Sequence, residues 1–113
     1  MSKRVLAIDD ERLILSFIKR GLEKVGYDVH TASDKDEALN LLEANSYDLV
    51  LADVVLPGLK EGEVIDLIKQ RWPETKVIVI TGKASSITAD GFLEKPFMLE
   101  ELRRLVSSAI GDA

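Results

Sequence analysis

Short apolar segments alternate with amphipathic segments along the whole chain. The apolar segments predict five strands, at Val5–Ile8, Tyr27–Ala32, Tyr47–Ala52, Lys76–Ile80 and Gly91–Glu94. Between them, apolar residues recur at three- and four-residue spacing, which is typical of helices that cover a sheet. Ser33 is the predicted N-cap of the second helix. Strands that alternate with helices predict an α/β fold with a parallel sheet covered on both faces.

Length and composition fit one domain of this kind. The chain has 113 residues, of which 46% are hydrophobic, and it has no cysteine. We interpret residues 1–113 as a single domain. No apolar run approaches the about 20 residues that a membrane-spanning helix needs, and the N-terminal apolar run is too short for a signal peptide. We therefore expect a cytoplasmic protein that does not bind a membrane.

The charge of the chain argues against nucleic-acid binding. There are 20 acidic and 15 basic residues, with a net charge of -5. Proteins that bind nucleic acids usually carry a basic patch, and here the basic residues are scattered. We expect no direct contact with DNA or RNA.

Polar residues stand at the carboxyl ends of four of the predicted strands. Asp9 and Asp10 follow the first strand, Asp53 follows the third, Thr81 follows the fourth and Lys95 follows the fifth. Open α/β sheets bind ligands at the carboxyl ends of their strands. These side chains are therefore the candidate functional residues, and we expect them to lie together.

Three carboxylates at one sheet edge repel one another and need a cation. Oxygen ligands without histidine or cysteine suit Mg²⁺, and Lys95 adds a second positive charge. A carboxylate beside Mg²⁺ can attack a phosphorus atom and hold the phosphoryl group as an acyl phosphate. Asp53 is the candidate for that role, with Lys95 and Thr81 near the phosphoryl oxygens.

Each of these residues alone has a simpler explanation. Asp9 and Asp10 could cap the first helix, Thr81 could simply end a strand, and Lys95 could lie on the surface. Phe92 could be an ordinary core aromatic. His30, on the second strand, is interpreted as structural or exposed.

Taken together, the motifs resemble the receiver domain of bacterial two-component response regulators. The resemblance covers the whole chain and rests on five motifs: Asp9-Asp10-Glu11, Asp53 with Leu56-Pro57, Gly62, Thr81-Gly82 and Lys95-Pro96-Phe97. It implies a flavodoxin-like, doubly wound sheet of five parallel strands in the order 2-1-3-4-5, with five helices.

The resemblance also implies a role for each matched residue. Asp53 would be the phosphoacceptor, and Asp10, Asp53 and the carbonyl of Val55 would bind Mg²⁺, with Asp9 acting mainly through water. Thr81 and Lys95 would contact the phosphoryl group. Phe92 matches the position of an aromatic switch residue. Pro57, Gly62 and Pro96 match structural residues, and family members often have a cis peptide bond before the proline that corresponds to Pro96.

One segment departs from the family pattern. Nine residues, Gly82–Asp90, separate Thr81 from the fifth predicted strand, whereas a parallel crossover needs about a dozen or more. We expect the family's fourth helix to be shortened or absent, and Phe92 to be unusually exposed. One predicted helix follows Lys95-Pro96, so we expect no effector domain in this chain.

The function that these features favour is a phosphorylation-controlled signalling switch. A histidine kinase or a small phosphodonor would phosphorylate Asp53, and a downstream protein or a phosphotransfer protein would respond. We do not expect an enzyme, apart from autophosphorylation and autodephosphorylation of the domain itself. Two alternatives stay open: a degenerate receiver that docks partners without phosphorylation, and a Mg²⁺-dependent phosphohydrolase with an aspartate nucleophile. Against the hydrolase, Val54-Val55 supply no second acid or base beside Asp53.

Overall fold

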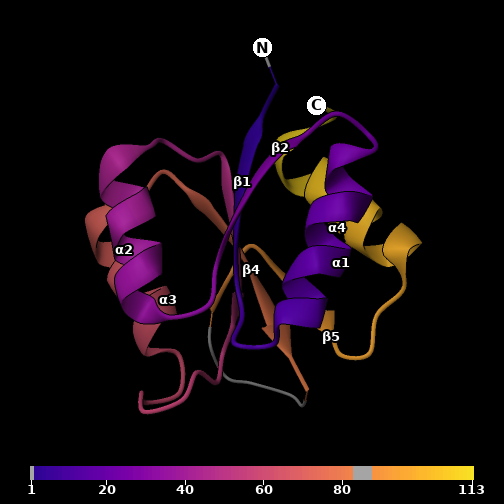
Figure 1. Cartoon of the computed structure of the whole chain (residues 1–113). Coiled ribbons are helices and arrows are strands. Elements are labelled where there is room, and N and C mark those ends of the chain that lie inside the picture. Colours follow the sequence, from indigo (N-terminus) through magenta and orange to yellow (C-terminus); the bar gives the residue numbers. More distant parts are fainter. Residues whose placement is uncertain (1, 83–87) are drawn as a thin grey trace.

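Five parallel strands form one sheet in the described part of the chain. A computed structural model describes residues 2–82 and 88–113. The strands are β1 (Arg4–Ile8), β2 (Asp28–Ala32), β3 (Leu49–Asp53), β4 (Lys76–Thr81) and β5 (Gly91–Glu94). Their order in the sheet is β2-β1-β3-β4-β5, and every neighbouring pair is parallel. The predicted fold class and strand order are confirmed (Figure 1).

Helices cover both faces of the sheet. Within the described residues they are α1 (Arg12–Glu23), α2 (Lys35–Ala44), α3 (Glu63–Arg71) and α4 (Leu99–Ile110). Figure 1 shows α2 and α3 on one side of the sheet and α1 and α4 on the other. None of these helices is long and apolar enough to cross a membrane.

The prediction about the family's fourth helix is not settled by the structure. The fourth helix along the chain is α4, which follows β5. The predicted shortening concerns the crossover between β4 and β5, and residues 83–87 of that crossover lie outside the described residues. Phe92 on β5 is 46% exposed, as expected from the sequence.

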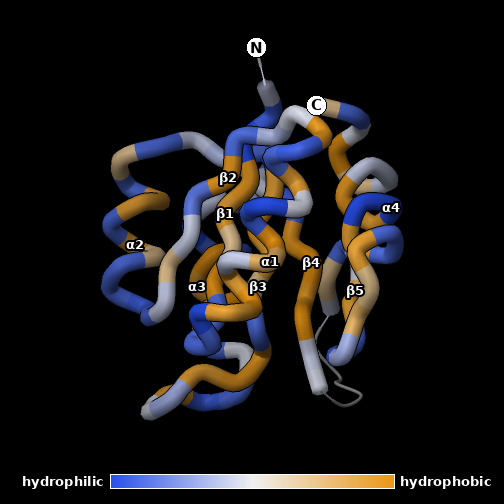
Figure 2. Tube along the Cα trace, turned by 45° about the vertical axis from the view of Figure 1, so that its right-hand side comes forward, coloured by the Kyte–Doolittle hydropathy of each residue, from blue (hydrophilic) through white to orange (hydrophobic). Residues whose placement is uncertain are grey.

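The core consists of two layers, one on each face of the sheet. Alternate residues of a strand point to opposite faces, so Leu6 and Ile8 of β1 join the layer under α2 and α3, whereas Val5 and Ala7 join the layer under α1 and α4. All five residues of β3 are buried. Figure 2 shows the apolar residues gathered along the central strands. The carboxyl ends of β1, β3 and β4 are therefore held by packing on both faces.

One helix cap differs from the prediction. The N-cap of α2 is Asp34, not Ser33. Asp34 Oδ1 accepts a hydrogen bond from Glu37 N at 2.8 Å, and Glu37 Oε1 accepts one from Ser33 N at 2.8 Å. The carboxylate caps the helix one residue later than predicted because Asp34 and Glu37 together satisfy two backbone donors.

Candidate functional site

The predicted functional residues meet at the carboxyl edge of the sheet. The strand registers pair Ile8 with Ala52, Asp53 with Ile80 and Thr81 with Glu94. The residues at or just after these strand ends therefore lie side by side. Asp9, Asp53 and Thr81 are buried polar residues in an otherwise apolar core.

Three aspartates form a cluster that could hold a metal ion. One carboxylate oxygen each from Asp9, Asp10 and Asp53 lies within 4.8 Å of the other two. Asp9 is fully buried, whereas Asp10 is exposed. Asp9 Oδ2 is buried without an aligned hydrogen-bond donor. The cluster offers only oxygen ligands, and one of them, the buried Asp9 Oδ2, accepts no hydrogen bond from the described residues. Such a set of ligands fits Mg²⁺.

Lys95 brings a positive charge to the site. Its Nζ lies 2.8 Å from Asp53 Oδ2 and 2.8 Å from Asp9 Oδ2. The contact with Asp53 is a hydrogen bond, whereas the contact with Asp9 is close but not aligned as one. Burial favours the neutral amine, but the two carboxylates outweigh burial, so the pKa of Lys95 is raised above its usual value. The two carboxylates therefore favour the charged ammonium form of Lys95 beside Asp53.

Asp9 is the carboxylate with the least favourable surroundings. Burial raises the pKa of Asp9 above its usual value, and the contacts with Lys95 and the Glu11 backbone N–H only partly offset this effect. The hydrogen bond from Glu11 N to Asp9 Oδ1 is 2.8 Å long. Because burial disfavours the charged form, the Asp9 carboxylate gains more from a bound cation than an exposed one would.

The loop after β3 orients Asp53. Val55 N donates to Asp53 Oδ1 at 2.9 Å, so one carboxylate oxygen is fixed by backbone and the other by Lys95. Gly62 N donates to the Val54 carbonyl at 2.9 Å and closes the loop. Gly62 has a φ of 74°, a left-handed conformation that glycine adopts without steric cost. This geometry gives Gly62 a structural role in the loop after Asp53, and Pro57 lies in the same loop.

The β4 and β5 ends are connected through backbone. Lys95 N donates to the Thr81 carbonyl at 2.8 Å, which holds the start of the Lys95 loop against the end of β4. The peptide bond between Lys95 and Pro96 is cis, as the resemblance implies. Phe92 lies on β5 at the margin of the site, outside the acidic cluster.

Glu11 joins the site, and sequence reasoning gave it no role. Its Oε1 lies 3.3 Å from Lys95 Nζ, and its side chain is 60% exposed. Glu11 is also the N-cap residue of α1, but its side chain makes no capping hydrogen bond. Asp9 does not cap the helix either, since its Oδ1 accepts from Glu11 N. The acidic run therefore serves the strand-end site rather than the helix.

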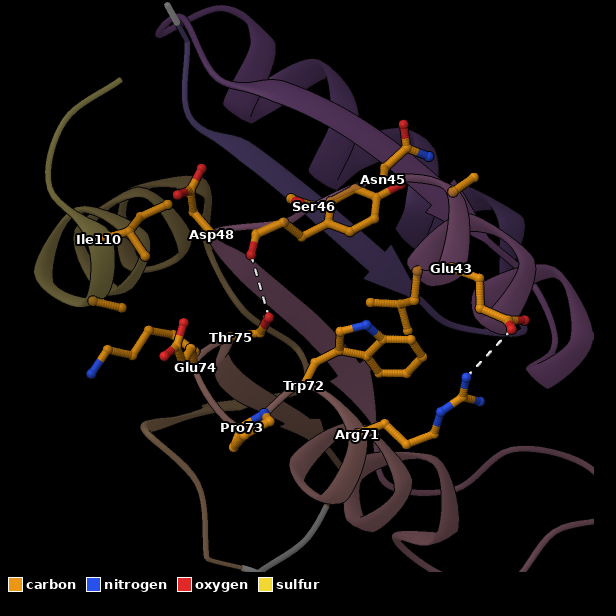
Figure 3. Close-up of a pocket in the computed structure, with 15 residues that line it drawn as sticks. Glu43, Asn45, Ser46, Asp48, Arg71, Trp72, Pro73, Glu74, Thr75 and Ile110 are labelled. Carbon is orange, nitrogen blue, oxygen red and sulfur yellow. Dashed lines mark hydrogen bonds and ion pairs between the residues drawn. The ribbon is translucent and has the colours of Figure 1, made fainter.

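A groove lies at the opposite edge of the sheet. It has a volume of about 860 Å³ and is lined by the ends of α2, α3 and α4 and the starts of β3 and β4. Figure 3 shows Trp72 at its centre. The Arg71 guanidinium lies over the indole at 4.6 Å and pairs with Glu43 at 3.3 Å. None of the candidate residues lines this groove, so the strand-end chemistry takes place elsewhere.

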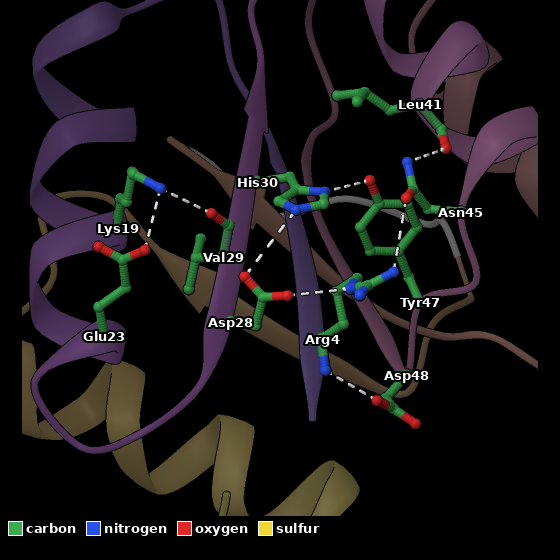
Figure 4. A network of polar contacts seen from close by, with 10 residues as sticks. All are labelled: Arg4, Lys19, Glu23, Asp28, Val29, His30, Leu41, Asn45, Tyr47 and Asp48. Atoms are coloured by element: carbon green, nitrogen blue, oxygen red, sulfur yellow. Dashed lines mark hydrogen bonds and ion pairs between the residues drawn. The ribbon is translucent and has the colours of Figure 1, made fainter. Parts of the chain in front are cut away.

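A polar network holds the amino ends of β1, β2 and β3 together (Figure 4). Arg4 Nε pairs with Asp28 Oδ2 at 3.0 Å, and Arg4 N donates to Asp48 Oδ2 at 2.8 Å. His30 Nδ1 lies 2.7 Å from Tyr47 Oη. His30 is thus a partly buried, hydrogen-bonded residue away from the site, in agreement with its structural interpretation.

The sequence of the whole domain matches a known family. The family described as response regulator receiver domain matches residues 5–107. The chain belongs to this family. Its acidic cluster, strand-end lysine and strand order therefore have a common explanation in a receiver domain of two-component signalling.

Known receivers share both sequence and fold with this receiver domain. The alkaline phosphatase synthesis transcriptional regulatory protein PhoP of Bacillus subtilis is 34% identical over 97% of the chain. The chain spans about half the length of that relative (49%).

Solved structures agree with the fold. The CheY-like receiver domain protein of Methanospirillum hungatei is 30% identical, with a TM-score of 0.91 over 97% of this chain and 94% of its own. The response regulator TrrA of Thermotoga maritima, in complex with Mg²⁺-BeF, is 33% identical, with a TM-score of 0.85 over 95% of this chain and 98% of its own.

Proposed function

We propose that this receiver domain is a phosphorylation-controlled switch in which Asp53 accepts the phosphoryl group and partner binding changes as a result. The observation that carries the proposal is the position of the Asp53 carboxylate, 2.8 Å from the Lys95 ammonium and within the cluster of Asp9 and Asp10. A carboxylate held between an ammonium and a cation site is positioned to attack an electrophilic phosphorus.

The cation that fits the site is Mg²⁺. Asp10, Asp53 and the Val55 carbonyl would hold it, with Asp9 behind them. When bound, Mg²⁺ would neutralise charge on the phosphoryl oxygens. The structure of TrrA was solved with Mg²⁺-BeF, which supports the same cation here.

The transfer step is a displacement at phosphorus. A carboxylate oxygen of Asp53 forms a bond to phosphorus, and the bond from phosphorus to the donor breaks. The donor group leaves with the electron pair, as an imidazole when the donor is a phosphohistidine. Lys95 stabilises the negative charge that develops on the phosphoryl oxygens, and the Thr81 hydroxyl is the expected hydrogen-bond donor to one of them.

Apolar side chains beside the site favour a protein as the phosphodonor. Leu13 and Phe17, on one stripe of α1, are 87% and 41% exposed, and Met98 is 70% exposed. The Phe17 ring packs against Phe97 at a centroid distance of 5.9 Å. Exposed apolar side chains grouped on one surface mark contacts with other proteins. A cytoplasmic histidine kinase is the donor we propose, and a downstream protein or phosphotransfer protein is the proposed output partner.

Intact-mass measurement after incubation with acetyl phosphate and Mg²⁺ tests the proposal. The wild type should gain one phosphoryl group, and a chelator should prevent this. Asp53→Asn keeps the side-chain size but removes the nucleophile, so it should gain none. Asp48→Asn, just before the opposite end of β3, is the matched control and should react like the wild type.

Two results would contradict the assignment. An Asp53→Asn protein that gains the phosphoryl group as fast as the wild type would exclude Asp53 as the acceptor. A wild type that gains nothing from acetyl phosphate or from a kinase would favour the phosphorylation-independent docking module instead.

A further inference from the structure

Glu11 contacts the lysine of the phosphoacceptor site from the solvent side. Three carboxylates surround Lys95 Nζ: Asp9 and Asp53, each at 2.8 Å, and Glu11 at 3.3 Å. The side chain of Asp9 is buried and that of Asp53 is nearly so, whereas that of Glu11 is 60% exposed. Glu11 is thus the member of this set that an incoming phosphodonor meets first.

The backbone of Glu11 is fixed although its side chain is exposed. Glu11 N donates to Asp9 Oδ1, and the Glu11 carbonyl accepts from Leu15 N at 3.2 Å in the first turn of α1. The side chain does not cap the helix but reaches a lysine 84 positions away in the sequence. Helix capping therefore does not explain the carboxylate.

The charge balance of the site makes Glu11 decisive. Among the residues that the structure describes, four carboxylates, those of Asp9, Asp10, Glu11 and Asp53, face one ammonium, that of Lys95, which leaves a formal charge of -3 for this set. A divalent cation would bring this to -1, and without Glu11 the balance would be zero. Asp9, Asp10 and Asp53 form the cation cluster, so Glu11 is the carboxylate of this set that lies outside the cluster and is exposed to an incoming anion.

We infer that Glu11 determines which phosphodonors the site accepts: its carboxylate disfavours small anionic donors in proportion to their charge. The inference rests on the proposed role of Asp53. The Coulomb energy between Glu11 and a donor scales with the charge of the donor. A phosphoryl group on a neutral imidazole of a docked protein is brought to Asp53 by protein contacts, which offset that repulsion.

Two small donors of different charge test this inference. Near neutral pH, acetyl phosphate is a dianion and phosphoramidate is a monoanion. Attack by Asp53 breaks the P–O bond in the first, releasing acetate, and the P–N bond in the second, releasing ammonia. In Glu11→Gln, at saturating Mg²⁺ and low salt, we expect the rate to rise about fourfold with acetyl phosphate and about twofold with phosphoramidate. Both gains should shrink as salt is added.

Two variants serve as controls. Glu74→Gln changes the net charge equally at an exposed position at the opposite edge of the sheet, so both rates should stay at the wild-type values. Glu11→Asp keeps the charge and should keep the wild-type ratio of the two rates. In metal-free protein, the NMR signal of the Lys95 ammonium should shift in Glu11→Gln but not in Glu74→Gln.

The outcomes separate the two proposals. Equal changes of both rates in Glu11→Gln, or no change in the Lys95 signal, would overturn the role of Glu11 while leaving Asp53 as the acceptor. Failure of the wild type to react with both small donors and with a kinase would overturn the proposed function and the donor selectivity together, whereas failure with the small donors in wild type and Glu11→Gln alike, with a kinase still active, would overturn the role of Glu11 alone.

Discussion

Asp10 is the exposed member of the acidic cluster, and its charge has opposite consequences with and without metal. In the metal-free protein it adds repulsion to Asp9 and Asp53, which lie within 4.8 Å of it by one oxygen each. With Mg²⁺ present it becomes a ligand in our proposal. The clustered carboxylates therefore lower the stability of the metal-free fold, and the same carboxylates favour binding of a cation.

Changing Asp10→Ala should remove the stabilisation that Mg²⁺ gives. A ligand that binds only the folded state at a hundredfold excess over its Kd stabilises by about 2.7 kcal/mol, so the wild-type melting temperature should rise with Mg²⁺. In Asp10→Ala that rise should disappear, and the metal-free melting temperature should increase slightly as repulsion is relieved. Calorimetry with and without Mg²⁺ measures both effects.

An exposed aspartate outside the cluster provides the control. Asp36 lies in the first turn of α2, and Asp36→Ala should keep the full response to Mg²⁺. If Asp10→Ala also kept it, Asp10 would not be a ligand.

At the scale of elements, an ion pair joins the first turns of α2 and α3, near the loop that follows Asp53. Lys35 Nζ lies 3.0 Å from Glu63 Oε2, between the first turns of the two helices. Lys60 N also donates to Glu63 Oε1, at 3.3 Å. Through Glu63, the ion pair connects the loop after Asp53 to α2.

The pKa of Glu63 reports this ion pair. The hydrogen bond from Lys35 holds the pKa of Glu63 below its usual value of 4.5. The pair thus contributes stability above pH 4.5, and this contribution is lost as the pH falls through the lower pKa of the folded state. Carbon NMR titration should show the pKa of Glu63 returning toward 4.5 in Lys35→Met.

A second exposed pair gives the matched control for that titration. Lys19 pairs with Glu23 at 2.9 Å on α1, and Lys19→Met removes the same charge. It should leave the pKa of Glu63 where it is in the wild type. An unchanged value in Lys35→Met would show that the ion pair does not form in solution.

Strands and helices could be predicted from the sequence where the local residue pattern determines them. Each predicted strand overlaps the observed one, with ends that differ by at most two residues, because apolar runs fill a sheet that is buried on both faces. The cap of α2 was misplaced by one residue because Ser33 and Asp34 are both good caps, and the contact with Glu37 decides between them. The crossover before β5 stays a prediction.

The strand-end site was predictable only in part. Parallel strands bring their carboxyl ends together, so Asp9, Asp53 and Lys95 could be grouped from their positions in the sequence. The contact of Glu11 with Lys95 joins residues 84 positions apart, and it depends on the direction of one exposed side chain. Sequence pattern does not determine that direction.

At the scale of the whole molecule, we expect the sheet to join the two core layers into one cooperative unit. β1 and β3 contribute side chains to both layers, so loosening one layer disturbs strands that support the other. The strand-end site depends on both layers, since Lys95 precedes α4 and the loop after Asp53 leads into α3. Loss of packing in either layer should therefore affect the site through the stability of the whole domain.

Changing Leu102→Ala tests this cooperativity. Leu102 is fully buried in the layer under α1 and α4, whereas Trp72, the one tryptophan of the chain, packs against the other layer. The variant should lose about 2–5 kcal/mol of unfolding free energy. Urea unfolding followed by Trp72 fluorescence and by circular dichroism should give the same lowered midpoint. Leu13→Ala, at an 87% exposed position on α1, should shift it by no more than about 0.5 kcal/mol. A Trp72 midpoint that stays at the wild-type value in Leu102→Ala would mean that the two layers unfold independently, and the strand-end site would then lie between two separately stable halves.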